Sequence, residues 1–554
     1  MSLNIPATRS EPDGFNGDIG WTSELAIPLG LMVLGLLGTT VVPWLGVLIL
    51  LGGYTWVLWR SIPIAAAAYV VLAPLPFEVL VHAHKIYWSD LMAIFLLVAV
   101  LYRLRTTKTE PFQGGVSRHR APSDASFGRQ VLDLFFPKSY RWALIFLLGL
   151  SVLSLAVALS HSGTVIKILE YVEFFVVIVG VFRFAGRSPS IWKLYIYALL
   201  ASASILSLYG FGQFLFGLGP ISHQISVYHV RAESVFGQPN PFGGFEADLF
   251  PLVAALIALG PKTLPKRWLT AGLVVITLGI ISSYSRGAWV SDMGAVVIML
   301  LLVLLTQGKR SFSMVVPYAV GIPVLAFIFI DVIGKVDLKP LYHAVAIGSR
   351  PSPHVLGRFI KARPMARTVA AAKVIQRKPA TKILAHANPM TKIFSLIGAI
   401  IHPHKYYDVQ QRFIIWHSAL EDFFHHLWLG VGLGNFHLYI QHHRPKDLVG
   451  GIPPTATNLY LEWGADLGIG GFIAGVWLEW CWVVTALKAV RTSLKTADPL
   501  WYALAVGSFG TIAAFIIQNW VDFLIDHGVV LPFLLALALI GYILSGKSIK
   551  SQGS

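Results

Sequence analysis

Charged side chains lie inside the apolar runs of this sequence, where an ionisable group costs several kcal/mol unless it is paired or in contact with water. Lys167, Glu170 and Glu173 are spaced three apart and share one helix face, so an internal ion pair explains them as well as a function does. Most of the others also fall near one end of a run: Asp90, Glu246, Asp248, Arg286, Asp292, Glu462, Asp466, Asp522 and Asp526. Because the set draws on many separate runs, it predicts a polar cavity at one end of a bundle.

Three motifs flank this predicted cavity, each with an arginine beside glycines and other polar residues. They are RAESVFGQPNPFGG (231–244), SYSRGAWV (283–290), and RFIIWHSALEDFFHHLWLGVGLGNF (412–436) followed by PTATNLYLEWGADLGIGG (454–471). A single arginine at a membrane edge is more often an anchor in lipid headgroups than a reactive group. The combination of the three motifs favours a functional site. Its candidate residues are Arg231, Asn240, Arg286, Arg412, Trp416, Asn458, Glu462 and Asp466.

The composition requires a membrane environment for the elements that position these residues. The chain is 55% hydrophobic and 13% charged, with a mean hydropathy of +0.67, so it lacks the polar surface of a soluble protein. Apolar runs of roughly 20 residues, enough to cross about 30 Å of hydrocarbon, number about fourteen. We therefore predict an all-α polytopic membrane protein with about 12–14 transmembrane helices. The single cysteine, Cys481, excludes an intrachain disulfide and a cysteine metal cluster.

Lysine and arginine recur in alternate loops, which predicts the orientation of the chain. If the N-terminus is cytoplasmic, every inside loop carries Lys or Arg, as the positive-inside rule requires. The net charge of +16 then reflects membrane orientation, and we expect no nucleic-acid partner. The predicted parts are a cytoplasmic tail (1–22), a transmembrane bundle (23–333) with a cytoplasmic loop (104–141) and a periplasmic loop (219–240), a large periplasmic loop (334–456), C-terminal transmembrane helices (457–545) and a cytoplasmic tail (546–554).

The large loop at 334–456 divides into two parts. Residues 340–405 form a basic insertion of low complexity, which suits a basic surface helix or a disordered segment. Residues 407–428 place their aromatic and leucine side chains on one helical face. This predicts an amphipathic helix docked on the outer end of the bundle.

The motifs resemble the O-antigen ligase and O-antigen polymerase superfamily, whose members carry the Wzy-type C-terminal domain. The resemblance covers about residues 200–545. It rests on Ser285-Arg286-Gly287-Ala288, on Arg412 and Trp416 leading into Gly430-Val431-Gly432-Leu433-Gly434-Asn435-Phe436, and on Asn458-Leu459-Tyr460-Leu461 followed by Asp466-Leu467-Gly468.

The resemblance implies a glycosyltransferase in a bacterial inner membrane with its active face in the periplasm. Members move a glycan from an undecaprenyl diphosphate carrier onto an acceptor hydroxyl, with inversion and without a nucleotide sugar, metal or cofactor. Membrane lipids are the remaining expected partner. Arg286 matches the essential arginine of the family, and Arg231 and Arg412 are further candidates for the diphosphate. Glu462 and Asp466 are candidate catalytic acids, whereas Asn240, Asn458 and Trp416 are candidate binding residues.

One position departs from the family pattern. The ligases carry a histidine directly before the asparagine that matches Asn458, as the proposed general base, and Thr457 stands there in this chain. Threonine is no base near pH 7. The departure favours a polymerase or exopolysaccharide-assembly activity, with another group as the base. The candidates for that group are Glu170, His417, His437, Glu462 and Asp466.

Two other functions compete with glycan transfer. Bicarbonate or ion transport also suits intramembrane acids, and some members of the superfamily are linked to bicarbonate uptake. Against transport, the charged residues concentrate at one end of the runs, and the two halves of the sequence show no clear inverted repeat. A scaffold for other assembly proteins would need no such charged end.

Overall fold

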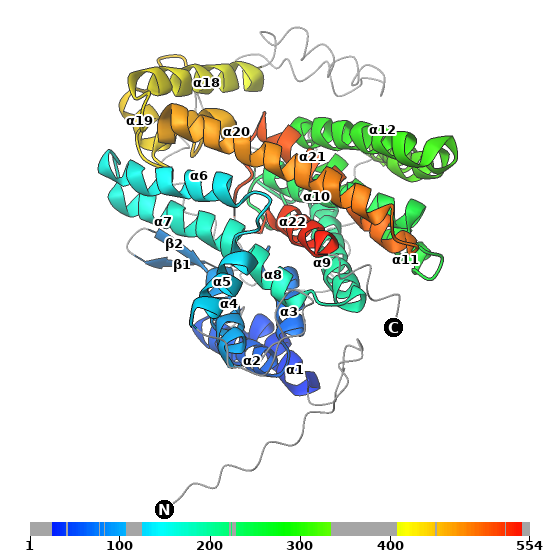
Figure 1. The fold of residues 1–554 in the computed structure, drawn as a ribbon. Helices are drawn as coiled ribbons and strands as arrows, with labels where there is room; N and C mark the ends of the chain where they lie inside the picture. Colours follow the sequence, from blue (N-terminus) through cyan, green and yellow to red (C-terminus); the bar gives the residue numbers. More distant parts are fainter. Residues whose placement is uncertain are drawn as a thin grey trace, which may run out of the picture.

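The computed structural model confirms the predicted all-α polytopic architecture (Figure 1). It describes residues 25–39, 43–76, 78–81, 84–106, 124–220, 223, 229–333, 407–448, 451–526 and 528–545. The basic insertion at 340–405 lies outside the described residues. An unexpected feature is a short antiparallel hairpin of β1 (Glu78–Val81) and β2 (His84–Tyr87), in which Glu78 lies opposite Tyr87.

Five stretches of helix are long and apolar enough to cross a membrane. They are α9 (Pro189–Phe216), α10 (Pro239–Leu259), the stretch of α12 and α13 (Arg286–Ile333), α20 (Leu459–Ser493) and α21 (Pro499–Asn519). Shorter apolar helices are α1 (Ala26–Gly38), α2 (Pro43–Arg60), α3 (Ile62–Leu72), α6 (Arg141–Leu153) and α22 (Leu531–Leu544). The chain is thus a multi-pass membrane protein, and the figure of about 12–14 spans stays a prediction.

The remaining helices complete the bundle and its outer edge. They are α4 (Trp88–Thr106), α5 (Asp124–Phe135), α7 (His161–Val172), α8 (Val179–Ala185), α11 (Lys266–Ser282), α18 (Tyr407–His425) and α19 (Phe436–His442). A π-helical stretch (Glu173–Ile178) joins α7 to α8. A helix is present in the 407–428 segment as α18, which packs beside the first half of α20 at the edge of the molecule (Figure 1). Its predicted apolar face is wrong, because Phe413, Leu420 and Phe424 are exposed, and the buried side chains are those of Ile415, Ser418, Ala419 and Asp422.

Two glycines with positive φ interrupt the long helices. Gly308 (φ 78°) separates the two helical parts of α12 (Arg286–Val316), which leads through a π-helical turn (Pro317–Gly321) into α13 (Ile322–Ile333). Gly468 (φ 67°) breaks α20 after its first turns. Only glycine adopts such a φ without a steric cost, so both breaks are encoded locally.

The centre of the bundle is formed by α10, α21 and α22 (Figure 1). Burial covers 94% of the apolar window of α10 but 44% of that of α20, which places α10 inside the protein and leaves one face of α20 for lipid. The close packing depends on small residues, because a Cβ atom at Gly507 would lie 2.7 Å from the Cα atom of Leu252. This rigid centre carries the segments that form the candidate site.

Candidate functional site

The connection between α21 and α22 brings the predicted motifs together. The side-chain amide of Asn458 donates to the carbonyl of Trp520 at 2.7 Å, and Arg412 forms an ion pair with Asp522 at 3.6 Å. A Cβ atom at Gly287 would touch Val521 at 3.2 Å. We call this end of the bundle the mouth, and the opposite end the far end. The mouth comprises residues 231–244, 283–290, 412–436, 454–466 and 518–526.

Arg231 joins the first motif to the second. Its Nη2 donates to the side-chain oxygen of Asn240 at 2.8 Å, and its Nε donates to the carbonyl of Ser283 at 3.1 Å. Asn240 was expected just before the helix, but it lies in the first turn of α10, because Pro239 starts that helix. The two candidate residues are therefore in direct contact.

Arg286 is the first residue of α12 and is half-buried. The hydroxyl of Ser285 caps the helix by accepting from the amide of Ala288 at 3.3 Å, and Tyr284 before it has a left-handed φ of 50°. This tight turn fixes the start of the helix at the mouth. Because a helix N-terminus carries partial positive charge, it adds to the guanidinium in attracting an anion.

Arg412 and Trp416 lie one turn apart on α18. The ring of Trp416 packs against Phe413 with centroids 5.4 Å apart, and its buried Nε1 has no hydrogen-bond partner among the described residues. A buried indole donor usually finds a partner, so this unsatisfied N–H is an exception. α18 thus carries a guanidinium and an unsatisfied indole donor one turn apart.

Three other predicted residues use their polar atoms to hold the backbone. The carboxylate of Asp466 accepts from the amides of Gly434 (2.6 Å), Phe436 (2.9 Å) and Asn435 (3.1 Å).

Glu462 accepts from the amide of Ala456, and Asn458 caps α20 by accepting from Tyr460 (3.0 Å) and Leu461 (3.1 Å). The structure therefore brings Asn458, Glu462 and Asp466 to the mouth, but it gives each of them bonds that position loops.

Lys167 joins α7 to the same region. Its ammonium pairs with Glu170 at 2.6 Å and lies 5.6 Å from the ring centroid of Phe523, with Asp526 in electrostatic range. The ion pair expected from the spacing is thus present, and it also faces the mouth. Gln518 was missed, although its Oε1 accepts from Ser291 at 3.0 Å. An amide near the end of an apolar run was the available signal, and a search for ionisable residues overlooks it.

Other members of the predicted charged set are buried inside helices or bonded to the backbone. Glu246, Asp248 and Asp292 are buried within α10 and α12, where both carboxylate oxygens of Glu246 and of Asp248 have no partner among the described residues. Asp90 instead accepts from the amide of Tyr87 at 2.9 Å, at the start of α4. The described residues contain no group of three or more His, Cys, Asp or Glu arranged to hold a metal ion.

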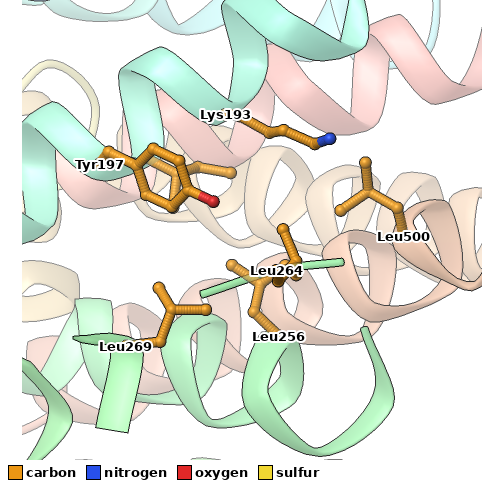
Figure 2. Close-up of a pocket in the computed structure, with 7 residues that line it drawn as sticks. Lys193, Tyr197, Leu256, Leu264, Leu269 and Leu500 are labelled. Carbon is orange, nitrogen blue, oxygen red and sulfur yellow. The ribbon is translucent and has the colours of Figure 1, made fainter. Parts of the chain in front are cut away.

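The pocket in Figure 2 belongs to the far end. Leu264 lies in the connection after α10, and Leu500 lies in the first turn of α21, whereas the mouth contains the opposite ends of both helices. The pocket is mainly apolar and has no arginine, so it does not suit a phosphate group. Its lining is Lys193, Ile196, Tyr197, Leu256, Leu264, Leu269 and Leu500.

Comparison with known proteins identifies the domain that carries most of the mouth. Residues 271–476 match the family model described as O-antigen ligase. The match begins in α11 and ends in α20, so it includes Arg286, Arg412 and Asp466, and it leaves out Arg231 and the 518–526 segment. The search of curated proteins finds no match to the chain. With its apolar helices, the chain is a multi-pass membrane protein that carries, over residues 271–476, a domain matching the O-antigen ligase family model.

Proposed function

We propose that this protein transfers or polymerises glycan from an undecaprenyl diphosphate carrier onto an acceptor hydroxyl during synthesis of a cell-surface polysaccharide, either O-antigen or exopolysaccharide. The observation that carries the proposal is the convergence of three arginine motifs on the 518–526 segment. Arg231 bonds to the turn that precedes Arg286, Gly287 of that turn packs on Val521, and Arg412 pairs with Asp522.

The arginines suit a diphosphate leaving group. As the glycosidic bond breaks, its electron pair moves to the carrier, and the diphosphate gains negative charge. A guanidinium binds phosphate oxygens through two parallel hydrogen bonds and stabilises that charge most strongly where water is excluded. We assign this role first to Arg286, because the N-terminus of α12 reinforces its charge. Arg231 and Arg412 then hold the remaining phosphate oxygens.

The other candidate residues suit the glycan. Trp416 offers an aromatic face and its Nε1 donor to a sugar, and the amide of Asn240 lies beside Arg231. The acceptor hydroxyl attacks the anomeric carbon from the side opposite the carrier, which inverts that carbon and requires no metal. We place this chemistry at the periplasmic face of a bacterial inner membrane, since lysine and arginine dominate the loops of the far end.

Replacing Arg286 with Ala in the host cell, and following the size distribution of its surface glycan, tests the proposal. We expect Arg286→Ala and Arg286→Lys both to abolish transfer, because lysine lacks the planar fork. Arg310→Ala is the matched control, since Arg310 is exposed at the other end of α12. Short units still attached to the acceptor would indicate a polymerase, whereas full-length polymer left on the carrier would indicate a ligase. Unchanged glycan in Arg286→Ala cells would refute the proposal.

One observation favours ion transport as a second candidate. Glu246 and Asp248 are buried in α10 with unpartnered carboxylate oxygens, and buried acids in membrane helices often belong to ion or proton pathways. An Asp248→Asn variant separates the two functions. It would stop bicarbonate or proton flux into proteoliposomes if the protein transports ions, and would leave the surface glycan unchanged if it only transfers glycan.

A further inference from the structure

The mouth needs a proton acceptor for the hydroxyl that attacks, and the family position is occupied by Thr457. This residue has a left-handed φ of 52°, and its hydroxyl oxygen is buried without a partner among the described residues. The carboxylates of Glu462 and Asp466 are buried and accept hydrogen bonds from backbone amides, so their oxygens hold the loops of the mouth in place. We therefore expect the base among side chains whose basic atom is not used in this way.

His437 has the geometry of an oriented base. It lies in the first turn of α19 and is half-buried, with Nδ1 2.9 Å from the carbonyl oxygen of Gly434. A carbonyl only accepts hydrogen bonds, so Nδ1 carries the hydrogen and the neutral ring has its lone pair on Nε2. No described residue bonds to Nε2, and this atom is not buried. The ring thus presents its basic nitrogen to a ligand.

The loop before His437 is held rigidly. The carboxylate of Asp466 accepts from the amides of the three residues directly before His437, which are Gly434, Asn435 and Phe436. The side-chain amide of Asn435 also donates to the hydroxyl of Thr164 at 2.8 Å, which ties the loop to α7. Asp466, predicted from the sequence as a catalytic acid, thereby becomes a positioning residue for His437.

The surroundings keep the imidazole neutral. Burial lowers the pKa of His437, the Gly434 carbonyl raises it, and the charge of Lys167 lowers it, so it lies below the ordinary value of 6.5. Lys167 packs against the same turn, because a Cβ atom at Gly434 would lie 3.1 Å from its Cγ. The charged groups on this side are Lys167 and Glu170 of α7, Asp526 of the 518–526 segment, and Glu462 of α20.

We propose that His437 is the general base of glycan transfer, in place of the histidine that Thr457 replaces; this inference rests on the proposed function. Nε2 takes the proton of the acceptor hydroxyl as the acceptor oxygen bonds to the anomeric carbon. The bond from that carbon to the phosphate oxygen breaks, and its electron pair leaves with the carrier diphosphate. The imidazolium then returns its proton to water.

Two other histidines fit this role less well. His417 is mostly exposed on α18, where its Nδ1 lies 3.4 Å from Glu421. His426 bonds to the buried carboxylate of Asp422 at 2.7 Å, but its ring faces Tyr439. Tyr439 is two residues beyond His437 on α19 and so projects from the other side of the helix. His426 is therefore separated by α19 from Lys167 and the 518–526 segment.

The test uses the full-length protein in proteoliposomes, with lipid-linked glycan extracted from host cells that lack the gene. We expect His437→Ala to lower kcat by about 10²–10⁴-fold with little change in KM, to remove the acidic limb of the kcat profile below pH 6.5, and to regain activity with added imidazole. His437→Gln should behave in the same way, because it lacks a basic nitrogen. His442→Ala is the matched control, since His442 lies exposed on the same helix with its Nδ1 2.7 Å from the carbonyl oxygen of Leu438.

The outcomes separate the two proposals. If His437→Ala keeps its kcat and acidic limb while Arg286→Ala is inactive, His437 is not the base and the transferase proposal stands. Loss of the acidic limb in His426→Ala but not in His437→Ala would also overturn the inference. If Arg286→Ala is as active as the wild type, the proposed function itself fails.

Discussion

The two ends of the bundle use arginine in different ways. At the far end, Arg183 donates to the carbonyl of Asp133 at 3.0 Å and Arg187 to that of Phe184 at 3.0 Å, in the last turns of α5 and α8. A positive side chain there stabilises the negative end of a helix. At the mouth, Arg286 is the first residue of α12, at the positive end of that helix, where a bound anion is favoured. The position of an arginine along its helix thus separates a structural role from a binding role.

The largest difference between the two ends concerns activity. We expect Arg286→Ala to lower glycan transfer by at least about 10²–10³-fold. Arg183→Ala should mainly lower the melting temperature, because it removes the bonds to the carbonyls of Asp133 and Leu134. Melting temperatures in detergent and initial rates of both variants provide the measurement. An Arg183→Ala protein that melts normally but has lost its activity would remove the distinction.

Replacing a positive-φ glycine with alanine should destabilise the protein more at the mouth than at the far end. Gly308 (φ 78°) at the far end faces open space, so Gly308→Ala should cost about 1–2 kcal/mol of backbone strain. Gly430 (φ 64°) at the mouth has no such space, because a Cβ atom would fall on the backbone of Asp466. Gly430→Ala should therefore cost about 3 kcal/mol or more. Unfolding of both variants in denaturant measures the costs, and equal values would show that the mouth loop can move away from α20.

The contributions of Asp422 at the mouth and Asp133 at the far end to stability should depend on pH in opposite ways. We expect these effects to be smaller than those of the glycine variants. Burial raises the pKa of Asp422 to about 8, so between pH 3.8 and 8 the native state holds the proton more tightly than the unfolded chain. Its contribution to stability is complete below pH 3.8 and is lost as the pH rises through about 8. Asp422→Asn should remove this loss, which is at most about 1.4 kcal/mol per pH unit.

Asp133 at the far end provides the contrast. Partial burial raises the pKa of Asp133, but the hydrogen bond from Arg141 and the charges of Lys138 and Arg141 hold it below its ordinary value. Its contribution is present above pH 3.8 and disappears as the pH falls through the lowered pKa. Melting temperatures of the wild type, Asp422→Asn and Asp133→Asn from pH 3 to 9 test both assignments. The melting temperature of the wild type should fall relative to that of Asp422→Asn between pH 5.5 and pH 8.5. An unchanged difference between the two proteins would contradict the raised pKa of Asp422.

The sequence predicted elements whose pattern depends on local chemistry. The helical membrane fold follows from the apolar runs, and a helix at the position of α18 follows from the pattern of residues 407–428. Hydropathy did not indicate the breaks at Gly308 and Gly468. The mouth was also predictable in outline, because the arginine motifs and the acids pointed to one end of the bundle.

The roles of individual side chains were not predictable, because they depend on contacts between distant segments. Nothing in the spacing of Asp466 shows that its oxygens bind the amides of residues 434–436, or that His437 follows this loop. Hydropathy reports the free energy of moving a side chain out of water. It does not show whether the side chain then lies in lipid or inside the protein. Glu246 and Asp248 therefore joined the predicted cavity although both are fully buried within α10.

The length of α22 sets the depth of the mouth. This helix has 14 residues and is almost completely buried in the middle of the bundle. It is about 21 Å long, which is about 9 Å short of the hydrocarbon core of a bilayer. Protein surrounds it, so no lipid has to match its length, and its N-terminal end carries the 518–526 segment. The length of α22 therefore fixes the distance between the 518–526 segment and the far end of the bundle.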